Sequence, residues 1–274
     1  MPISNEQKPA FDAVAYWNKR YDRIDIGRSG HIDLPTEYNV WLYRRKRAHV
    51  AKAIAKVGAS LRGVKLLEVA AGSGAWMSFW KTQGVAEYFG IDLSERAIES
   101  LEQRFPEHHF LQRDLNDQGL AKAVGVGYDF VSAIDVLYYV TDDERFRATV
   151  ADLASVLKAN GLLIVHDQFL HGPASDHGYI KWRSLKDYEV ALTAAGFEIL
   201  YRRPTFFFMI QTVDLSGFAA KAMDSLWDRI LHPFIERFPN LAGAIGYVAD
   251  TVVCALLREG PAMEVMVCRK RGLL

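Results

Sequence analysis

The sequence predicts a doubly wound α/β fold, in which a largely parallel sheet lies between two layers of helices. From residue 64 onward, short apolar runs alternate with helix-like stretches, which is typical of parallel strands joined by crossover helices. The chain has 274 residues and half of them are apolar, so it can bury a large core. The first strong apolar run leads through a turn of small residues into a helix, as expected for this fold class.

Seven apolar runs are expected to form the strands of this sheet. They are Val64–Val69, Glu87–Ile91, His109–Gln112, Phe130–Ile134, Leu162–Val165, Phe197–Tyr201 and Met263–Cys268. The helices between them begin at recognisable caps, with Ser94 as an N-cap and Thr141–Glu144 as a capping box. Gly161 and Gly196 follow helical stretches, where a left-handed C-terminal cap is expected.

Two segments fall outside this alternation and divide the chain into three parts. Residues 1–60 are predicted to form a helical N-terminal cap, and residues 211–262 a helical insertion that covers the substrate. The insertion separates the last two strands and contains two helical stretches that are split near Pro239. The core of the fold is therefore predicted over residues 61–210 and 263–274.

Composition excludes several classes of protein. Lys plus Arg and Asp plus Glu each number 33, whereas a nucleic-acid-binding protein usually carries a positive excess, so no nucleic-acid partner is expected. Cys254 and Cys268 are too few for a disulfide framework, and residues 1–11 do not resemble a secretory signal, which favours a cytoplasmic location. The apolar stretch 241–257 carries Asp250, so stable membrane insertion is not expected, while peripheral membrane contact and a homodimer are left open.

The segment Leu66–Trp76 carries the main functional signal. A strand ends near Glu68 and is followed by a turn of small residues, 70–74, and then by a helix. Small residues let a ligand approach the backbone closely, and the start of a helix offers free amide groups. Asp92 ends the next strand, where a carboxylate can accept hydrogen bonds from the hydroxyls of a ribose. The strand ends therefore predict a nucleoside-binding crevice.

Two cofactor classes compete for this crevice. Ala70, Gly72 and Ala75 fit the fingerprint of a nicotinamide dinucleotide loosely, which makes an NAD(P)-dependent oxidoreductase one alternative. However, Glu68 would repel a pyrophosphate, and Asp114 at the end of the third strand can accept from an adenine amino group. Acids at three strand ends favour a cationic cofactor that has no phosphate.

The ordered set of motifs resembles the class I S-adenosylmethionine-dependent methyltransferases, over roughly residues 60–200 and the final strand. Glu68–Gly74 is similar to the first motif of the family, Asp129–Val140 to the fourth-strand motif, and Leu157–Gly161 to a later turn that here lacks its proline and one glycine. The resemblance implies S-adenosyl-L-methionine as the cofactor and a Rossmann-like sheet, mostly parallel with the last strand antiparallel. It also implies a set of cofactor-binding residues: Trp17, Glu68, Ala70, Gly72, Gly74, Asp92, Leu93, Asp114, Leu115 and Ile134. No metal site is predicted, because no cysteine and histidine pair has the spacing of a zinc site.

The candidate catalytic residues follow the fourth and fifth strands, whose ends open onto the crevice. A base near the acceptor helps transfer to a hydroxyl, and His166, His171 and Tyr138 are the candidates for this role. Each also has a structural interpretation, as a buried strand-end residue, a solvated loop residue or a pocket wall. Asp135 either caps a turn or contacts the ligand. The basic run Arg44–Arg47 is expected to be a solvated helix face, or else to bind an acidic substrate group.

The predicted function is methylation of a small-molecule acceptor in biosynthesis. The aromatic and apolar insertion favours the hydroxyl oxygen of a natural product, a sugar-bearing metabolite or a lipid-like metabolite. Methylation of carbon or nitrogen in a small metabolite and the oxidoreductase remain the alternatives. A member that binds the cofactor without catalysis is a third class, because the family has no obligatory catalytic residue.

Overall fold

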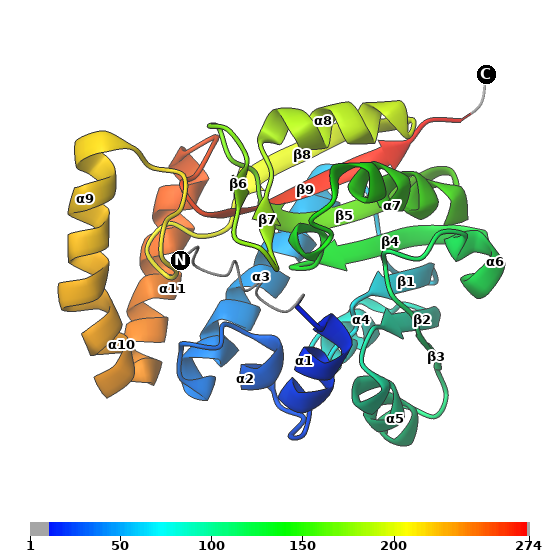
Figure 1. Cartoon of the computed structure of the whole chain (residues 1–274), viewed down its shortest axis with the longest axis horizontal. Coiled ribbons are helices and arrows are strands. Elements are labelled where there is room, and N and C mark those ends of the chain that lie inside the picture. The colour runs from blue at the N-terminus through cyan, green and yellow to red at the C-terminus, as the bar shows by residue number, and fades with distance from the viewer. Residues whose placement is uncertain (1–10, 273–274) are drawn as a thin grey trace, which may run out of the picture.

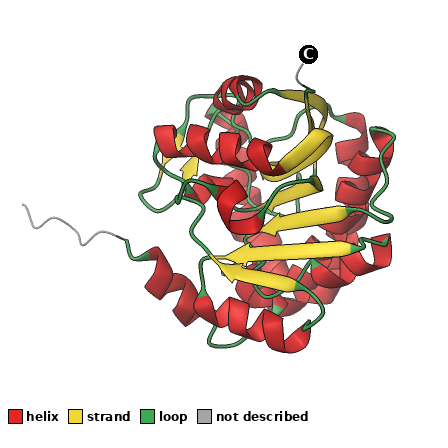
Figure 2. Cartoon of the chain, turned by 90° about the vertical axis from the view of Figure 1, so that its right-hand side faces the viewer, coloured by secondary structure: helices red, strands yellow, loops and turns green. Residues whose placement is uncertain are grey.

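The computed structural model describes residues 11–272, and its centre is a seven-stranded sheet with helices on both faces (Figure 1 and Figure 2). The strand order is β3-β2-β1-β4-β5-β9-β8, and β9 is antiparallel to both of its neighbours whereas the other pairs are parallel. The strands are β1 (Lys65–Val69), β2 (Glu87–Asp92), β3 (His109–Gln112), β4 (Tyr128–Ile134), β5 (Leu157–Gln168), β8 (Phe197–Pro204) and β9 (Met263–Lys270). The predicted α/β fold class is confirmed.

Helices cover both faces of the sheet, and a small hairpin follows β5. The helices of the main body are α1 (Ala13–Arg20), α2 (Ile26–Ser29), α3 (Thr36–Lys56), α4 (Met77–Gln83), α5 (Glu95–Arg104), α6 (Leu120–Val124), α7 (Asp143–Val156) and α8 (Leu185–Ala194), with a 3-10 turn η1 (Leu137–Tyr139). The hairpin consists of β6 (Ser175–Asp176) and β7 (Lys181–Trp182). The first ten residues of the predicted N-terminal cap lie outside the described residues.

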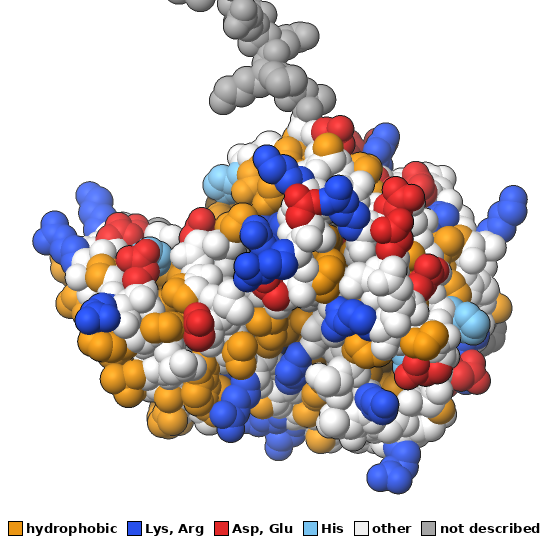
Figure 3. Space-filling model, turned by 90° about the horizontal axis from the view of Figure 1, so that it is seen from below, with side chains coloured by type: hydrophobic (Ala, Val, Ile, Leu, Met, Phe, Trp, Pro, Cys, Tyr) orange, Lys and Arg blue, Asp and Glu red, His pale blue; other side chains and the backbone are white. Residues whose placement is uncertain are grey.

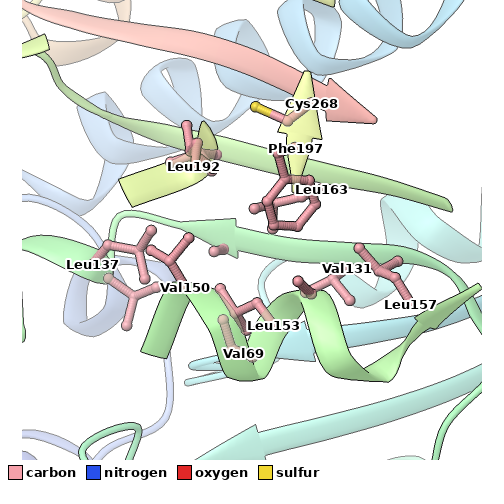
Figure 4. Close-up of a cluster of buried hydrophobic side chains, with 14 of the residues drawn as sticks. Val69, Val131, Leu137, Val150, Leu153, Leu157, Leu163, Leu192, Phe197 and Cys268 are labelled. Carbon is pink, nitrogen blue, oxygen red and sulfur yellow. The ribbon is translucent and has the colours of Figure 1, made fainter. Parts of the chain in front are cut away.

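Side chains that alternate along the strands build two apolar layers. Leu67, Val131 and Leu163 face α6, α7 and α8, and this cluster is drawn in Figure 4. Their neighbours along the strands, such as Leu66 and Ile164, face α3, α4 and α5. Because successive side chains of a strand point to opposite faces, a strand that is apolar throughout must be covered on both sides. This explains the continuous apolar runs of the sequence.

Two of the predicted helix boundaries are wrong. Ser94 caps α5 as predicted, but Thr141 does not cap α7. Asp142 takes that role, and its carboxylate accepts hydrogen bonds from two free amides of the first turn. Gly161 is not a helix cap either, because it lies within β5, and Asn160 adopts the left-handed backbone with φ of 64°. Asparagine tolerates this conformation better than most residues that carry a side chain.

The insertion between β8 and β9 forms a group of helices at one end of the sheet (Figure 1). It contains α9 (Gly217–Leu226), a π-helical turn η2 (Trp227–Leu231), α10 (His232–Arg237) and α11 (Pro239–Leu256). Pro239 opens α11, where a proline is well tolerated, so it marks the start of this helix rather than a linker. By length and composition alone, α11 could also cross a membrane.

A buried carboxylate ties α11 to the protein. Asp250 is fully buried, and its oxygens accept hydrogen bonds from the amides of Phe207, Phe208 and Met209 at 3.0, 2.8 and 3.3 Å. Arg45 of α3 donates to the Asp250 carbonyl oxygen at 2.7 Å. Burial raises the pKa of Asp250 even though these donors favour its charged form. The charge that interrupts the apolar stretch is thus an anchor within the fold.

The basic run Arg44–Arg47 is not a solvated helix face. Arg45 and Lys46 expose only 6% and 7% of their surface, and Arg45 also donates to the carbonyl oxygen of Thr205 at 2.7 Å. Lys46 pairs with Asp135, and Arg47 donates to the carbonyl oxygen of Ala75. Only Arg44 fits the prediction. The run joins α3 to the insertion, to β4 and to the turn after β1.

Replacing Asp250 by alanine is expected to lower the free energy of unfolding by about 3 kcal/mol, because three buried amides lose their acceptor. Urea unfolding of both proteins measures this difference. Asp228→Ala, at an exposed position of η2, is the control and should change the stability little. Equal stability of the two variants would contradict the role of Asp250 as an anchor.

Candidate functional site

A cavity of about 730 Å³ opens at the carboxyl ends of β1 to β4. This volume lies within the range of small-molecule sites, and the position is where ligands bind in open α/β sheets. The structure brings these predicted cofactor residues together in its lining: Trp17, Ala70, Asp92, Leu93, Asp114, Leu115 and Ile134.

Two strand ends turn sharply into this cavity. Ala70 after β1 and Asp135 after β4 both adopt positive φ, of 59° and 57°. Aspartate visits this region more readily than alanine, so Ala70 is the more strained of the two. Strained backbone of this kind clusters at functional sites. A glycine at position 70 would adopt this backbone conformation without strain, so alanine is an unfavourable residue for this turn.

Asp92 connects β2 to the turn after β1. Its two carboxylate oxygens accept hydrogen bonds from the amides of Gly72 and Ser94, both at 2.8 Å. Burial raises the pKa of Asp92 to about 6, although these two amides favour the charged form. The carboxylate therefore fixes the shape of the turn and also forms part of the cavity wall.

The neighbouring part of the wall is fixed at the end of β3. One oxygen of Asp114 accepts hydrogen bonds from the backbone amide and the side-chain amide of Asn116, both at 2.8 Å. The carbonyl oxygen of Leu115 accepts from the hydroxyl of Thr149 in α7 at 3.0 Å. These bonds set the backbone of the segment that presents Asp114 and Leu115 to the cavity.

The N-terminal helix α1 closes one side of the cavity with aromatic side chains. Trp17 stacks on Tyr21 and meets Tyr139 edge-on, with ring centroids 5.7 and 5.3 Å apart. Tyr21 and Ser29 lie directly over the turn, because a Cβ at Gly72 would be 2.7 Å from the Tyr21 hydroxyl and 2.9 Å from the Ser29 hydroxyl. Gly72 does not line the cavity. Glycine is needed there so that the aromatic layer can approach.

Glu68 and Gly74 also lie outside the cavity, so the structure does not support direct cofactor contact for either. A Cβ at Gly74 would be 2.8 Å from Leu101, so this residue is needed for packing against α5. Glu68 is buried and accepts hydrogen bonds from Trp80 Nε1 at 2.8 Å and from the Tyr88 hydroxyl at 2.7 Å. Burial raises its pKa to about 7. Glu68 thus organises the interior beneath the turn.

Asp135 stands in the cavity wall with two partners behind it. His166 Nδ1 lies 2.5 Å from one carboxylate oxygen, and Lys46 pairs with the other. Burial opposes ionisation of Asp135, but Lys46 and His166 outweigh it and hold its pKa well below the ordinary value. His166 itself is fully buried and does not line the cavity. It lies behind Asp135 and is not placed to take a proton directly from an acceptor, contrary to the prediction. Among the described residues, its Nε2 has no hydrogen-bond partner.

The other two catalytic candidates are also placed away from the cavity. His171 lies against Asp214 and has Nε2 3.1 Å from Glu259, so it joins the loop after β5 to the two ends of the insertion. Tyr138 packs against the apolar cluster between α3 and the insertion. Tyr139, the next residue of the 3-10 turn, faces the cavity instead. The sequence places both tyrosines after β4 but does not reveal which one turns inward.

Several residues that line the cavity could not be predicted from the sequence. They are Phe11, Tyr21, Ser29, Tyr43, Arg113, Asn116, Arg145 and Tyr179. Most belong to the N-terminal segment or to loops without a recognisable motif. The proximity of Asn116 to Asp114 in the sequence was the one available signal, because an amide two residues after an aspartate often closes a turn.

The lining fits a cationic nucleoside. Asp92, Asp114 and Asp135 supply negative charge, and the aromatic rings of Trp17 and Tyr139 line the same cavity. Arg113 is held at the rim, where it donates to the carbonyl oxygens of two neighbouring residues. These carboxylate acceptors and aromatic rings match S-adenosyl-L-methionine, which combines a ribose, an adenine and a sulfonium centre without phosphate.

Comparison with known proteins also indicates a methyltransferase domain. A family profile described as a methyltransferase domain matches residues 41–202. An uncharacterized protein of Haemophilus influenzae is 27% identical over 115 residues, which cover 38% of this chain and 42% of that protein. The chain therefore spans less than half the length of this curated relative.

Solved structures share the fold. A magnesium protoporphyrin IX methyltransferase from Synechocystis, crystallised with S-adenosylmethionine, has a TM-score of 0.55 at 16% identity and covers 97% of this chain and 100% of its own. The [4+2]-cyclase SpnF has a TM-score of 0.53 at 16% identity, with 82% and 80% covered. A methyltransferase from Clostridium acetobutylicum has a TM-score of 0.53 at 10% identity, with 84% and 92% covered.

The family match covers more than half of the chain and includes the strand ends that line the cavity. This match decides against an NAD(P)-dependent oxidoreductase, the alternative that the spacing of Ala70, Gly72 and Ala75 had left open. The chain belongs to the methyltransferase domain family, and it shares its fold with S-adenosylmethionine-dependent methyltransferases of known structure.

Proposed function

We propose that the protein methylates a hydroxyl oxygen of a small-molecule acceptor, and that Asp135 receives the hydrogen bond of that hydroxyl. The observation that carries this proposal is the position of Asp135, in the cavity wall at the end of β4 and backed by the buried groups of Lys46 and His166. S-adenosyl-L-methionine, when bound, supplies a methyl group that is already activated on sulfur. The protein has to position the acceptor and exclude water.

The cofactor is proposed to lie across the strand ends. Asp92 would accept hydrogen bonds from the ribose hydroxyls, while Asp114 and Leu115 would contact the adenine. This is supported by their shared place in the cavity and by the hydrogen bonds that hold each backbone segment. Trp17 and Tyr139 would cover the sulfonium side, where their faces favour a positive charge.

The low pKa of Asp135 fits its proposed role. Lys46 and His166 keep this carboxylate ionised, so it can accept a hydrogen bond from an acceptor hydroxyl at neutral pH. During transfer the bond from the sulfonium sulfur to the methyl carbon would break, with S-adenosylhomocysteine leaving, as the acceptor oxygen forms its bond to that carbon. The oxygen would then become positive and its proton far more acidic. A weakly basic carboxylate is then sufficient to receive that proton. Lys46 and His166 act as positioning residues, because each contacts Asp135 from behind the wall.

The acceptor is proposed to be a metabolite with an apolar or ring-bearing body. Phe11 and Tyr179 pack together at the cavity mouth with ring centroids 5.2 Å apart, and both line it. Aromatic walls exclude water and stack well on flat groups. The fold is shared with a magnesium protoporphyrin IX methyltransferase, so porphyrins belong in an acceptor screen beside hydroxylated natural products and lipids.

A second candidate is a cavity that binds the cofactor but catalyses another reaction. One structure that shares the fold is a [4+2]-cyclase. Formation of S-adenosylhomocysteine together with a methylated product distinguishes the two, since a cyclisation consumes no methyl group. Parallel screens of hydroxyl, amine and carbon acceptors separate the proposed O-methylation from N- or C-methylation.

Replacing Asp135 by asparagine is expected to lower kcat about a hundredfold, because the carboxylate that receives the proton is lost, and also to lower the stability, because Lys46 loses its charged partner. Asparagine tolerates the positive φ at this position, so the backbone turn should persist. Radiolabelled methyl transfer to an acceptor found in the screen measures kcat. Asp142→Asn is the matched control, because Asp142 also lines the cavity and asparagine is an equally good helix cap. An unchanged kcat in Asp135→Asn would refute the role of Asp135.

Cofactor affinity is expected to fall as the pH drops below about 6, because Asp92 has a pKa of about 6 and its protonated form is a poorer partner for a ribose and a cation. Above that pH the carboxylate is ionised and the affinity should level off. Well below it, the dissociation constant should rise by about tenfold per pH unit. Calorimetric titration at pH values from about 5 to about 8, which bracket this pKa, measures the dissociation constant.

Two variants isolate the origin of this pH dependence. Asp92→Asn should bind weakly at every pH and lose the dependence. Asp114→Asn, which changes a carboxylate elsewhere in the same wall, should weaken binding but retain the dependence. If Asp92→Asn keeps the full pH profile, another group is responsible.

Replacing Trp17 by alanine is expected to weaken cofactor binding by about tenfold, because the aromatic face over the proposed sulfonium position is removed. Trp182→Ala is the control, since Trp182 packs on His177 outside the cavity. Fluorescence or calorimetric titration with S-adenosylhomocysteine, which carries no positive sulfur, should show a smaller loss. Equal losses for both ligands would argue against contact with the sulfonium.

A further inference from the structure

The insertion exposes an apolar strip along α11. The outward-facing side chains are Leu241, Ile245, Val248, Val252 and Leu256, which recur at helical spacing over the length of the helix. The only charged residue of α11 is the buried anchor Asp250, so no charge interrupts the strip. In Figure 3 apolar side chains gather at the left-hand end of the molecule, where the insertion lies. Single apolar residues on a surface are common, but a continuous apolar strip marks an interaction site.

The neighbouring helix contributes protruding apolar side chains. Phe218 of α9 is 87% exposed, and Ile230 of η2 and Phe238 before α11 are also exposed. No residue of α9 is buried, so this helix is not packed into the core by an apolar face. Side chains that project singly in this way suit insertion among lipid chains.

The insertion and the adjoining α3 also carry exposed cations. In the insertion Lys221, Arg229, Arg237 and Arg258 are exposed, and on α3 the guanidinium of Arg44 lies 5.5 Å from the ring of Tyr247 in α11. The exposed acids of the insertion are Asp228, Glu236 and Glu259, and Glu259 is already paired with Arg202 and His171. With the half-buried Asp224 counted, the five cations stand against three acids outside the Glu259 pairs, so this surface carries a small positive excess although the chain as a whole is neutral.

We propose that this face, formed by the outer sides of α9 to α11 and Arg44, binds peripherally to an anionic lipid membrane. An apolar strip flanked by Lys and Arg is the pattern of a helix that lies in the membrane interface. The burial of Asp250 excludes that α11 spans the membrane in this fold, because its carboxylate would lose the hydrogen bonds from three backbone amides. A second copy on the same face would bring the like-charged side chains together, whereas anionic head groups neutralise them.

Sedimentation with lipid vesicles tests the proposal. The protein should bind vesicles of phosphatidylcholine mixed with phosphatidylglycerol, and bind phosphatidylcholine alone much more weakly. Val248→Glu combined with Val252→Glu should reduce binding to the mixed vesicles by about tenfold or more, because two aliphatic groups are lost and charge is added. Val190→Glu on α8 is the matched control, since Val190 is similarly exposed on another face and should leave binding unchanged.

A second pair of variants tests the positive charge of this surface. Arg237→Glu combined with Arg258→Glu should abolish the preference for anionic vesicles, while Lys186→Glu on α8 should not. Retained binding of S-adenosylhomocysteine shows that each variant is folded, and this readout is independent of the acceptor or of methyl transfer. The proposal is overturned if the protein binds neither kind of vesicle. It is also overturned if sedimentation velocity shows a dimer that the Val248 and Val252 changes dissociate without vesicle binding.

Discussion

The ion pair between Lys46 and Asp135 is the contact on which the rest of the site depends. It joins the long helix α3 to the end of β4, and His166 of β5 completes it from the far side of the carboxylate. Taking these groups out of water is costly, and the loss of either charged partner would leave the other buried and uncompensated. The cluster therefore fixes where α3 lies across the sheet, and with it the position of everything that α3 carries.

The neighbours of Lys46 in α3 extend this connection in two directions. Arg45 reaches the insertion through Asp250, and Arg47 reaches the turn after β1 through the carbonyl oxygen of Ala75. His49, one turn further on, lies 2.9 Å from the hydroxyl of Thr205, at the start of the segment that leads into the insertion. The run of basic residues thus links the turn after β1, the proposed catalytic carboxylate and the helices of the insertion.

Sequence alone could predict the sheet because burial on both faces leaves a direct pattern, the continuous apolar runs. It could also place Asp92 and Asp114, because Asp92 is the last residue of β2 and Asp114 follows β3, where the chain has reached the crevice. It could not place Glu68, whose direction depends on the Trp80 and Tyr88 donors that face it from α4 and β2. The choice between Tyr138 and Tyr139 likewise depends on a single 3-10 turn, which shifts which residue faces inward.

Asp135 and Asp92 differ in how the groups around them compensate their negative charge. Asp135 is compensated by Lys46, but the described residues give Asp92 only backbone amides, and its pKa rises to about 6 from 3.8. A carboxyl group whose folded pKa is raised favours the folded state most at low pH, and that contribution is lost as the pH rises through 6. At neutral pH Asp92 is therefore a cost to folding in the free protein. A cationic cofactor in the cavity offsets this cost, so the property that makes Asp92 unfavourable in the free protein also makes it a strong partner for the ligand.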